Sequence, residues 1–493
     1  MSSPSSPKRS AKDYFEEISS FDLFYQLTYM SATSAAGVSR SRVFELARQL
    51  ACPTAKFFKN IHEVAENLRY NYPDAVRLVG EKTKANETKS FLLRLSDALR
   101  SGEPLAAFLR RESAVQGDHY ENDYMRRLES LKKWNDGYVA MTISSALIVI
   151  IMMVSSIIYD MGTVTMMMMV MISIAASFGV AWILFRSGPQ ETISVSLKDG
   201  SKLQRRARKM FLTLAPLSVT AMLLAGVLGV PTGLVLIIGA ALLLPVGITA
   251  NKADDMTRKK DEEIAAFFRS VGGTATSRGT TLKEAIASIK LDSFPVLQND
   301  IHMLDLRLKS YGKPLLCWQT FGMETGSLLA KQAVGVFYEA VNLGGDPETA
   351  GNVTSDFAMK TAMLRTQRQG VGATFAWLTM VMHGVMGALM VFLLTVLEQF
   401  GVRMQEAMAT MNSGADAEAS LGLGNMFSFS TPQISFLTTV SIGMLFILSV
   451  VNAFAITASE GSHLIKINYY LSIMLMMGGV AFIFVPPLVR SLI

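Results

Sequence analysis

Residues 371–397 read VGATFAWLTMVMHGVMGALMVFLLTVL and contain no Asp, Glu, Lys or Arg. An α-helix rises about 1.5 Å per residue, so about 20 residues cross the ~30 Å hydrocarbon layer of a bilayer. This stretch is therefore long enough to span a membrane. Its one ionisable side chain is His383.

Six further windows carry none of these four charged residue types: 139–159, 163–185, 211–230, 232–250, 434–457 and 469–489. The seven windows hold 155 of the 493 residues, so the 46 basic and 40 acidic residues occupy about 25% of the remainder, the level of soluble proteins. The composition excludes a soluble globular enzyme, a fibrous protein and a disordered chain. Buried helices of a soluble core are the rejected alternative, because they rarely run so long without a charge. We predict a polytopic membrane protein with large water-facing parts.

The spacing of the windows predicts the domain order. Very short turns at Asp160–Gly162 and at Pro231 predict two transmembrane hairpins, 139–185 and 211–250, and the spans 371–397, 434–457 and 469–489 follow singly. The water-facing parts are a flexible tail (1–20), a first block (21–138), a basic loop (186–210), a second block (251–370), an outer loop (398–433) and a short loop (458–468).

The distribution of Lys and Arg predicts the orientation. With seven spans, 44 of the 46 basic residues fall on one side of the membrane. Cytoplasmic loops carry the excess of Lys and Arg. We therefore predict a multi-pass protein of the cell membrane with a cytoplasmic N-terminus and an extracytoplasmic C-terminus. Both blocks are then cytoplasmic, and basic loops beside anionic lipid explain the pI of about 9.1 without nucleic acid.

Both blocks show an apolar period near 3.6 residues, which is typical of helices. Each predicted helix closes on a glycine, as a left-handed C-terminal cap requires. They also resemble each other: SATSAAGVSRSRVFELA around Gly37 aligns with GTATSRGTTLKEAIASI around Gly279, and the turn around Gly102 aligns with that around Gly312. Two motifs in the same order indicate an internal duplication. The predicted fold is an all-α integral membrane protein with about seven transmembrane helices and two cytoplasmic helical-bundle domains.

The second block carries the stretch that identifies a family. A helix, a Gly-x-Pro-Leu turn and then GMETGSLL (Gly322–Leu329) resemble the type II secretion system F family, in which Gly-Glu-x-x-Gly-x-Leu joins two helices of a cytoplasmic bundle. Met323 between Gly322 and Glu324 departs from that motif, and the first block lacks it. The stretches EAVNLGGDPETAGNVTSDF and LRTQRQG, together with two fused domains, resemble the archaeal branch of the family, which serves archaella and type IV pili.

The resemblance implies a passive platform in the cytoplasmic membrane. Its expected partners are a hexameric secretion ATPase, pilin or archaellin subunits, membrane lipid and further copies of the chain. The sequence leaves open whether the filament is an archaellum, an adhesive pilus or part of a secretion system. Candidate partner-binding residues are basic residues beside the spans and one acidic residue in the matched turn: Arg205, Arg206, Arg208, Lys209, Arg258, Lys259, Lys260 and Glu324. The basic residues are the candidates for contact with the ATPase, whereas Glu324 is expected to form a structural cap or a contact between domains. Contact with lipid headgroups, or topology alone, is the alternative role of the basic residues.

No catalytic, cofactor or metal signature is present in the sequence. It contains no Gly-x-x-x-x-Gly-Lys-Ser/Thr loop, no Gly-x-Ser-x-Gly elbow, and no His or Cys spacing of a metal site. We therefore expect no enzyme, no cofactor and no metal. A transporter or channel is the remaining alternative, but the spans offer only His383 and Asn452 as polar candidates, and we expect these to make hydrogen bonds between helices.

Overall fold

The computed structural model describes residues 19–158, 162–195, 198, 200–310, 312–412 and 431–492. Most of the predicted tail 1–20, residues 160–161 of the first hairpin turn and half of the loop 398–433 lie outside these ranges. Every regular element of the described part is a helix, and seven helices are long and apolar enough to cross a bilayer. Each contains most or all of one of the seven predicted windows. The protein is an all-α, multi-pass membrane protein, as predicted.

The chain divides into two units. Unit 1 comprises residues 1–125 and 257–364, and unit 2 comprises residues 126–256 and 365–493. The chain passes from one unit to the other inside three long helices, which are α6 (Leu105–Ile158), α9 (Thr232–Arg278) and α14 (Pro347–Asn412).

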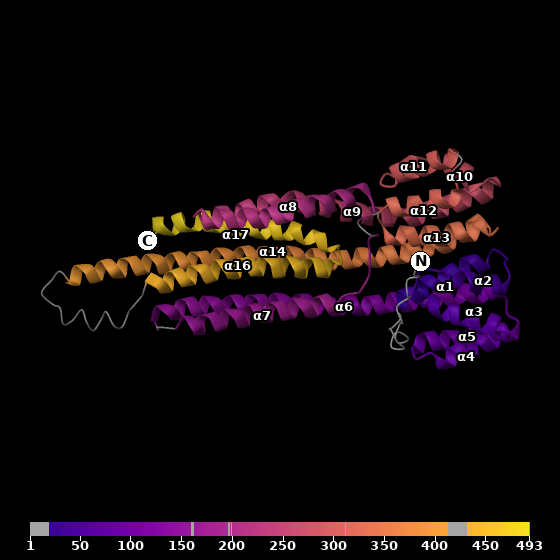
Figure 1. Ribbon diagram of the computed structural model, residues 1–493, viewed down its shortest axis with the longest axis horizontal. Helices are drawn as coiled ribbons and strands as arrows, with labels where there is room; N and C mark the ends of the chain where they lie inside the picture. Colours follow the sequence, from indigo (N-terminus) through magenta and orange to yellow (C-terminus); the bar gives the residue numbers. More distant parts are fainter. Residues whose placement is uncertain are drawn as a thin grey trace, which may run out of the picture. The chain divides into compact units, whose positions relative to one another are not determined.

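Unit 1 is a set of short helices around the ends of these long ones (Figure 1). Its first part contains α1 (Ser20–Ser34), α2 (Arg40–Ala47), α3 (Ala55–Asn67), α4 (Tyr72–Lys82) and α5 (Asn86–Ser101). Its second part contains α10 (Leu282–Ser288), the 3₁₀ turn η2 (Leu291–Ser293), α11 (Gln298–Lys309), α12 (Pro314–Glu324) and α13 (Leu328–Asn342).

The two blocks of unit 1 share one hydrophobic core. Phe24 of α1 contacts Phe357 of α14 with ring centroids 5.2 Å apart, and α1 packs against α13. The core also includes Trp318 and Phe337 of the second block. A smaller core lies within the first block alone. The predicted boundaries 21–138 and 251–370 therefore describe segments of the chain rather than two separate cores, because the large aromatic residues of both segments bury one another.

The paired glycine turns have the same backbone conformation. Gly37 and Gly279 have φ values of 73° and 59°, in the left-handed region that favours glycine. The helix after each begins at a hydroxyl N-cap, Ser39 or Thr281, whose side chain accepts a backbone N–H. This likeness supports the proposed duplication. At the end of α3 the left-handed position is instead taken by Arg69, so the expectation that each helix closes on glycine fails there.

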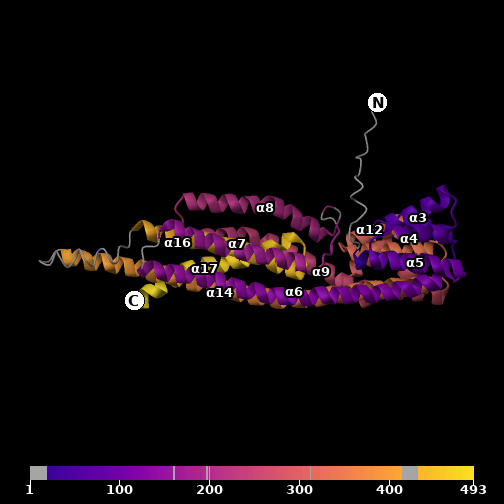
Figure 2. The same ribbon diagram turned by 90° about the horizontal axis from the view of Figure 1, so that it is seen from below.

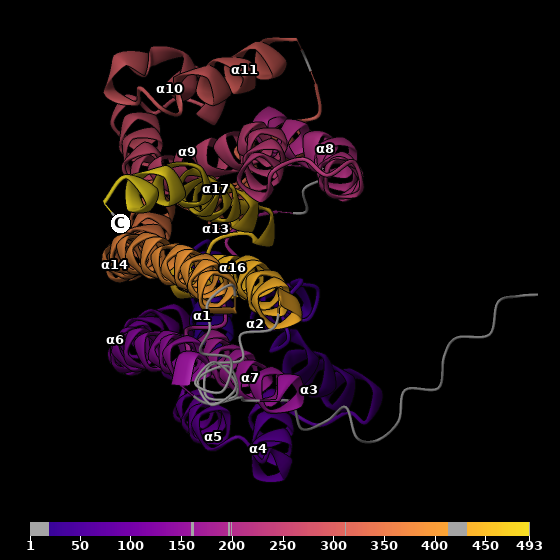
Figure 3. The same cartoon turned by 90° about the vertical axis from the view of Figure 1, so that its left-hand side faces the viewer.

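Unit 2 holds the apolar helices: α7 (Thr163–Ser187), α8 (Lys202–Val227), α16 (Thr431–Glu460) and α17 (Ile467–Leu492), together with parts of α6, α9 and α14. Helix α16 packs against α7 and α17, and Figures 2 and 3 show it beside both. One core joins α6, α7, α14 and α16. Helix α14 continues to Asn412, beyond the predicted end of its span at residue 397.

Close helix crossings in unit 2 depend on glycine. A Cβ on Gly384 of α14 would lie 2.3 Å from Met477 of α17, and a Cβ on Gly387 would lie 3.2 Å from Leu445 of α16. On α9, a Cβ on Gly247 would lie 2.4 Å from the backbone of Tyr469. Small residues at these points let helix backbones approach, as is usual between membrane helices.

Candidate functional site

The short connection between α16 and α17 is the most polar buried part of unit 2. Helix α16 ends at Glu460, and Gly461 takes a φ of 70°. The N–H of Gly461 donates to the carbonyl of Ala458 and the N–H of Ser462 donates to that of Thr457, which is the pair of bonds of a Schellman motif. A 3₁₀ turn, η3 (Leu464–Lys466), then leads directly into α17.

Arg368 of α14 satisfies the end of α16. Its guanidinium donates from Nε to the carbonyl of Ser459 (3.1 Å), from Nη2 to that of Ala458 (2.8 Å) and from Nη1 to that of Pro189 (2.7 Å). The last carbonyls of a helix have no partner within it, and they carry the negative end of the helix dipole. A buried cation at this place is therefore favourable.

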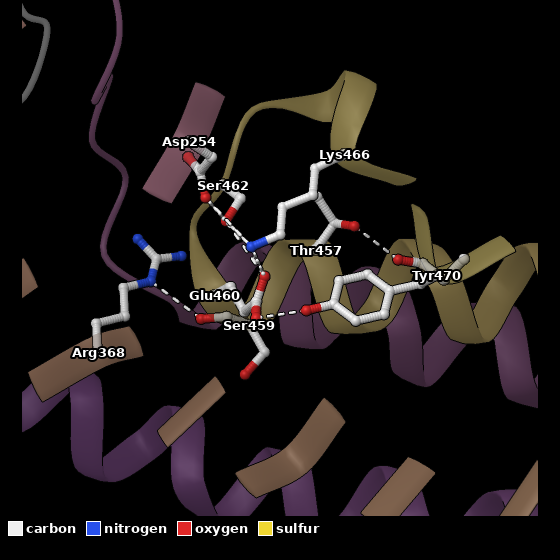
Figure 4. Close-up of polar contacts among 9 residues, drawn as sticks. Asp254, Arg368, Thr457, Ser459, Glu460, Ser462, Lys466 and Tyr470 are labelled. Atoms are coloured by element: carbon white, nitrogen blue, oxygen red, sulfur yellow. Dashed lines mark hydrogen bonds and ion pairs between the residues drawn. The ribbon is translucent and has the colours of Figure 1, made fainter. Parts of the chain in front are cut away.

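Lys466 lies between two carboxylates (Figure 4). Its Nζ is 2.7 Å from Oε2 of Glu460 and 3.2 Å from Oδ2 of Asp254 on α9. The phenol of Tyr470 on α17 donates to Oε1 of Glu460 at 2.6 Å, and the hydroxyl of Ser462 donates to Oδ2 of Asp254 at 2.9 Å. The three charged side chains are each at most 7% exposed. We call Asp254, Glu460, Lys466 and Tyr470 the Lys466 cluster.

The burial of these charges determines what the cluster does. Desolvation of an ion is costly, and it is offset only when the partner charges and hydrogen bonds are in place. Removing Lys466 leaves two buried carboxylates without their shared cation, which costs about 3–5 kcal/mol. The cluster therefore fixes the α16–α17 turn to α9, since its ions are satisfied only when α9, α16 and α17 meet.

We call the Lys466 cluster, together with Arg368 and the α16–α17 turn, the junction. Further polar contacts connect the junction to other helices of unit 2. Glu191, in the segment after α7, pairs with Arg365 of α14 at 3.3 Å, and both side chains are buried. Asn135 of α6 donates to the hydroxyl of Ser459 at 3.0 Å. The junction thus joins α6, α9, α14, α16 and α17 at one end of the spans.

His383 and Asn452 make the interhelical hydrogen bonds predicted for them. The two ring nitrogens of His383 lie 3.1 Å from the Ser449 hydroxyl and 3.1 Å from the Asn452 amide nitrogen. The Asn452 carbonyl accepts a 2.6 Å bond from Tyr138. Because each polar group has a partner on a neighbouring helix, these residues connect α6, α14 and α16.

The structure separates the predicted contact residues into exposed and buried groups. On α8, Arg205, Arg206 and Lys209 are exposed and Arg208 is half-buried. On α9, Lys259 is exposed, whereas Arg258 and Lys260 are 7% and 8% exposed. The Nζ of Lys260 pairs with Asp300 of α11 at 2.7 Å, so its charge serves unit 1 internally.

Glu324 does not form a helix cap. Its carboxylate accepts a 2.7 Å bond from Arg307, which ties α12 to α11 within unit 1. The N-cap of the following helix, α13, is Ser327. This arrangement differs from the contact between domains that the matched turn suggested.

The Lys466 cluster and Arg368 were not among the sequence candidates. One signal was present: Glu460 and Lys466 are the charges of a short loop between two charge-free windows, where a charge next to a span demands a partner. The partner Asp254 lies more than 200 positions earlier in the chain, and no local pattern connects it to that loop. In the described part of the chain, no group of His, Cys, Asp and Glu side chains could hold a metal ion.

Comparison with known proteins gives the family. A family model described as "Type II secretion system (T2SS), protein F" matches residues 27–153, from α1 to the membrane part of α6. Over this stretch the chain is similar to the type II secretion system F family. The match falls on the first block, although the motif Gly322–Leu329 lies in the second. Two blocks of one family related by duplication would account for both observations.

Two archaeal proteins are similar to most of the chain. The chain is 23% identical over 441 residues to "Flagella accessory protein J" of Methanocaldococcus jannaschii, covering 87% of this chain and 77% of the relative. It is 21% identical over 423 residues to the protein of the same name from Methanococcus voltae, covering 82% and 73%. No solved structure matches the chain.

Proposed function

We propose that the chain is the cytoplasmic-membrane platform on which a type IV pilus-like filament, an archaellum or a pilus, is assembled. It couples a hexameric secretion ATPase in the cytosol to the extraction of pilin-like subunits from the membrane and to their polymerisation. The observation that carries this proposal is the similarity to flagella accessory proteins over most of the chain, together with the match of residues 27–153 to the type II secretion system F family.

The helix continuity supports a mechanical role. The three helices α6, α9 and α14 each run from one unit into the other. Their helical backbone hydrogen bonding is therefore continuous across the unit boundaries. Asp254 and Arg368 lie close in sequence to the unit boundaries at Met256 and Leu364. A load that the ATPase applies to unit 1 would reach the spans through these helices, and the buried junction would resist separation of their ends.

The orientation follows from charge. The loops 186–210 and 458–468 flank the junction, and the first of these is strongly basic. Under the positive-inside rule this end of the spans faces the cytosol, with the N-terminus cytoplasmic and the C-terminus outside. Unit 1 then lies in the cytosol, where an ATPase can reach it.

We propose that the ATPase contacts the exposed basic candidates, which are Arg205, Arg206 and Lys209 on the surface of unit 2 and Lys259 on the surface of unit 1. Exposed cations increase association rates and determine which partner binds, because they act through long-range attraction. Arg258 and Lys260 are excluded from this surface by their burial. Charge reversal of Arg205, Arg206 and Lys209 to Glu is expected to weaken co-purification of the ATPase while the membrane level holds. Unchanged ATPase recovery would reject the surface but leave the platform role untouched.

The described geometry favours a platform over a transporter. The cavity beside His383 has a volume of about 20 Å³, which is room for about one water. The His383 and Asn452 side chains that line it form hydrogen bonds with side chains of neighbouring helices and do not line an open path for a solute. Both features are those of packed helices.

Deletion of the gene tests the platform role directly. Cells should lose surface filaments while filament subunits accumulate in the membrane, and electron microscopy with immunoblotting of membrane fractions checks both. Loss of swimming would assign the filament to an archaellum, and loss of adhesion alone to a pilus. Normal filaments of every kind in the deletion strain would refute the proposal.

A further inference from the structure

A pocket of about 660 Å³ opens beside the junction in unit 2. It is lined by the segment after α7, by α8, and by the α16–α17 turn. Its volume lies in the range of small-molecule sites, about 300–1,000 Å³. Neither the similarity to the family nor the proposed platform role gives this pocket an occupant.

The pocket is rich in positive charge. Lys198, Arg208 and Arg368 line it, and Glu191 is the one carboxylate among its lining residues. Glu191 already pairs with the buried Arg365, so its charge is compensated. An excess of cations in a concave site attracts an anion, because low-dielectric walls focus the field.

Arg368 has donors to spare. A guanidinium has five N–H groups, and three of these donate to backbone carbonyls at the end of α16 and at Pro189. In the described part of the chain it forms no ion pair with a carboxylate, although only 5% of it is exposed. The end of the helix supplies the equivalent of about half a negative charge, so the charge of Arg368 is only partly balanced.

His463 adds a neutral donor. Its Nδ1 accepts the backbone N–H of Ile465 at 3.2 Å, which places the proton of the neutral ring on Nε2. Desolvation lowers the pKa of His463, and Asp254 opposes this to a smaller degree. The ring is therefore uncharged at neutral pH and can donate one hydrogen bond.

The other wall of the pocket is apolar. Phe185 and Leu464 line it and are 37% and 59% exposed. Phe185 stacks with Phe454 at 5.7 Å and with the exposed Trp182 at 5.9 Å. Aromatic side chains gather at the depth of the headgroups in membrane proteins. Arginine at one side and exposed apolar rings at the other suit a ligand with a charged and an apolar end.

We propose that this pocket binds a phosphate group, carried by an anionic phospholipid headgroup or by a soluble phosphate. Arg208 and Lys198 bind its oxygens, with spare N–H groups of Arg368 and the Nε2–H of His463. Arginine suits phosphate because its planar fork donates two parallel bonds. A bound anion would balance the charge beside the α16–α17 turn and stabilise the junction.

The test uses the purified full chain and thermal unfolding. One arm titrates inorganic phosphate against chloride at equal ionic strength in detergent, and the other compares micelles doped with phosphatidylglycerol or with phosphatidylcholine. The variants are Arg208→Gln and Lys198→Gln, and the control is Arg206→Gln, an exposed arginine of the same helix that does not line the pocket. Phosphate stabilises proteins generally, so only the part of the shift that depends on the variant counts.

Wild-type protein and Arg206→Gln should unfold at a higher temperature in at least one arm. Losing one charged hydrogen bond should weaken the response of Arg208→Gln at least about tenfold in ligand concentration. A response to phosphatidylglycerol alone assigns the headgroup, and a response to inorganic phosphate alone assigns a soluble phosphate. No shift in either arm, or an equal loss in Arg206→Gln, would overturn the proposal.

Discussion

The guanidinium of Arg368 occupies the space that a side chain on Gly461 would need. A Cβ on Gly461 would lie 2.4 Å from Cζ of Arg368. Gly461 also has a φ of 70°, which side-chain-bearing residues rarely adopt. One glycine therefore allows both the turn after α16 and the capping of its carbonyls by Arg368.

Gly461→Ala should destabilise the protein more than Gly229→Ala does. Gly229 ends α8 in a similar turn, with a φ of 73°, and has open space where a Cβ would stand. The control should lose about 1–2 kcal/mol from backbone conformation alone. Gly461→Ala should lose about 1–3 kcal/mol more, because Arg368 must leave buried carbonyls. Thermal unfolding in detergent measures both, and equal losses would show that Arg368 moves aside without cost.

Lys466→Met should destabilise unit 2 by about 3–5 kcal/mol, because two buried carboxylates lose their shared cation. The control is Arg490→Met, which breaks the exposed 3.6 Å pair with Glu398 and should cost at most about 1 kcal/mol. Adding Asp254→Asn and Glu460→Gln to Lys466→Met should recover part of the loss, since no net charge then stays buried. If the triple variant is no better than the single one, lost packing rather than charge explains the effect.

Gly247→Ala should separate α9 from α17. The new methyl group would overlap the backbone of Tyr469, and overpacking of this kind costs about 1–3 kcal/mol. Gly443→Ala in α16 is the matched control, because nothing lies within 4 Å of its Cβ position. Alanine has the better helix propensity, so the control should be neutral or stabilising by up to about 1 kcal/mol. The unfolding temperatures of the two variants test this prediction. Equal destabilisation by both substitutions would contradict the close approach of α9 and α17 at Gly247.

Asp346 should make the stability of unit 1 depend on acid pH. It caps α14: its carboxylate accepts the Thr349 backbone N–H at 2.8 Å and hydroxyl at 2.7 Å, and the Thr276 hydroxyl at 2.8 Å. These bonds, those of Thr349 first, lower the pKa of Asp346 below its usual 3.8. The folded state therefore binds a proton less readily than the unfolded state. This contribution is present above about pH 4 and is lost as the pH falls through the lowered pKa.

Asp346→Asn separates the charge from the cap. Asparagine caps helices about as well as aspartate, so stability near pH 7 should change little. The decline between about pH 4 and pH 2 should become shallower than in the wild type. Asp346→Ala should instead lose about 1 kcal/mol at every pH. Unfolding followed by circular dichroism across this range gives the comparison, and parallel wild-type and Asn profiles would count against the assigned role.

Much of the fold follows from local sequence. The apolar side chains of a charge-free window of about 20 residues favour lipid over water. In lipid the backbone N–H and C=O groups must form hydrogen bonds with one another, and a helix allows this within the segment. For this reason the windows at 139–159 and 371–397 lie in helices, whatever their neighbours. Glycine after an apolar period predicted the turn at Gly37 by the same local reasoning.

Two other features of the fold depended on distant contacts. The sequence predicted blocks 21–138 and 251–370 as separate domains, yet Phe24 and Phe357 bury each other in one core. Amphipathic periodicity shows which face of a helix is apolar, but it does not name the helix that covers it. Among the basic candidates, the pattern of charge did not distinguish the buried Lys260 from the exposed Lys259, since that depends on the position of Asp300.

The sequence by itself determined the seven spans, the helical class and the concentration of basic residues on one side, because each rests on hydrophobicity and charge within short windows. Only the tertiary structure decided that Asp254, Arg368 and Lys466 meet at the end of α16. The physical reason is that a buried ion is stable only beside its partners, and those partners come from helices far apart in the chain.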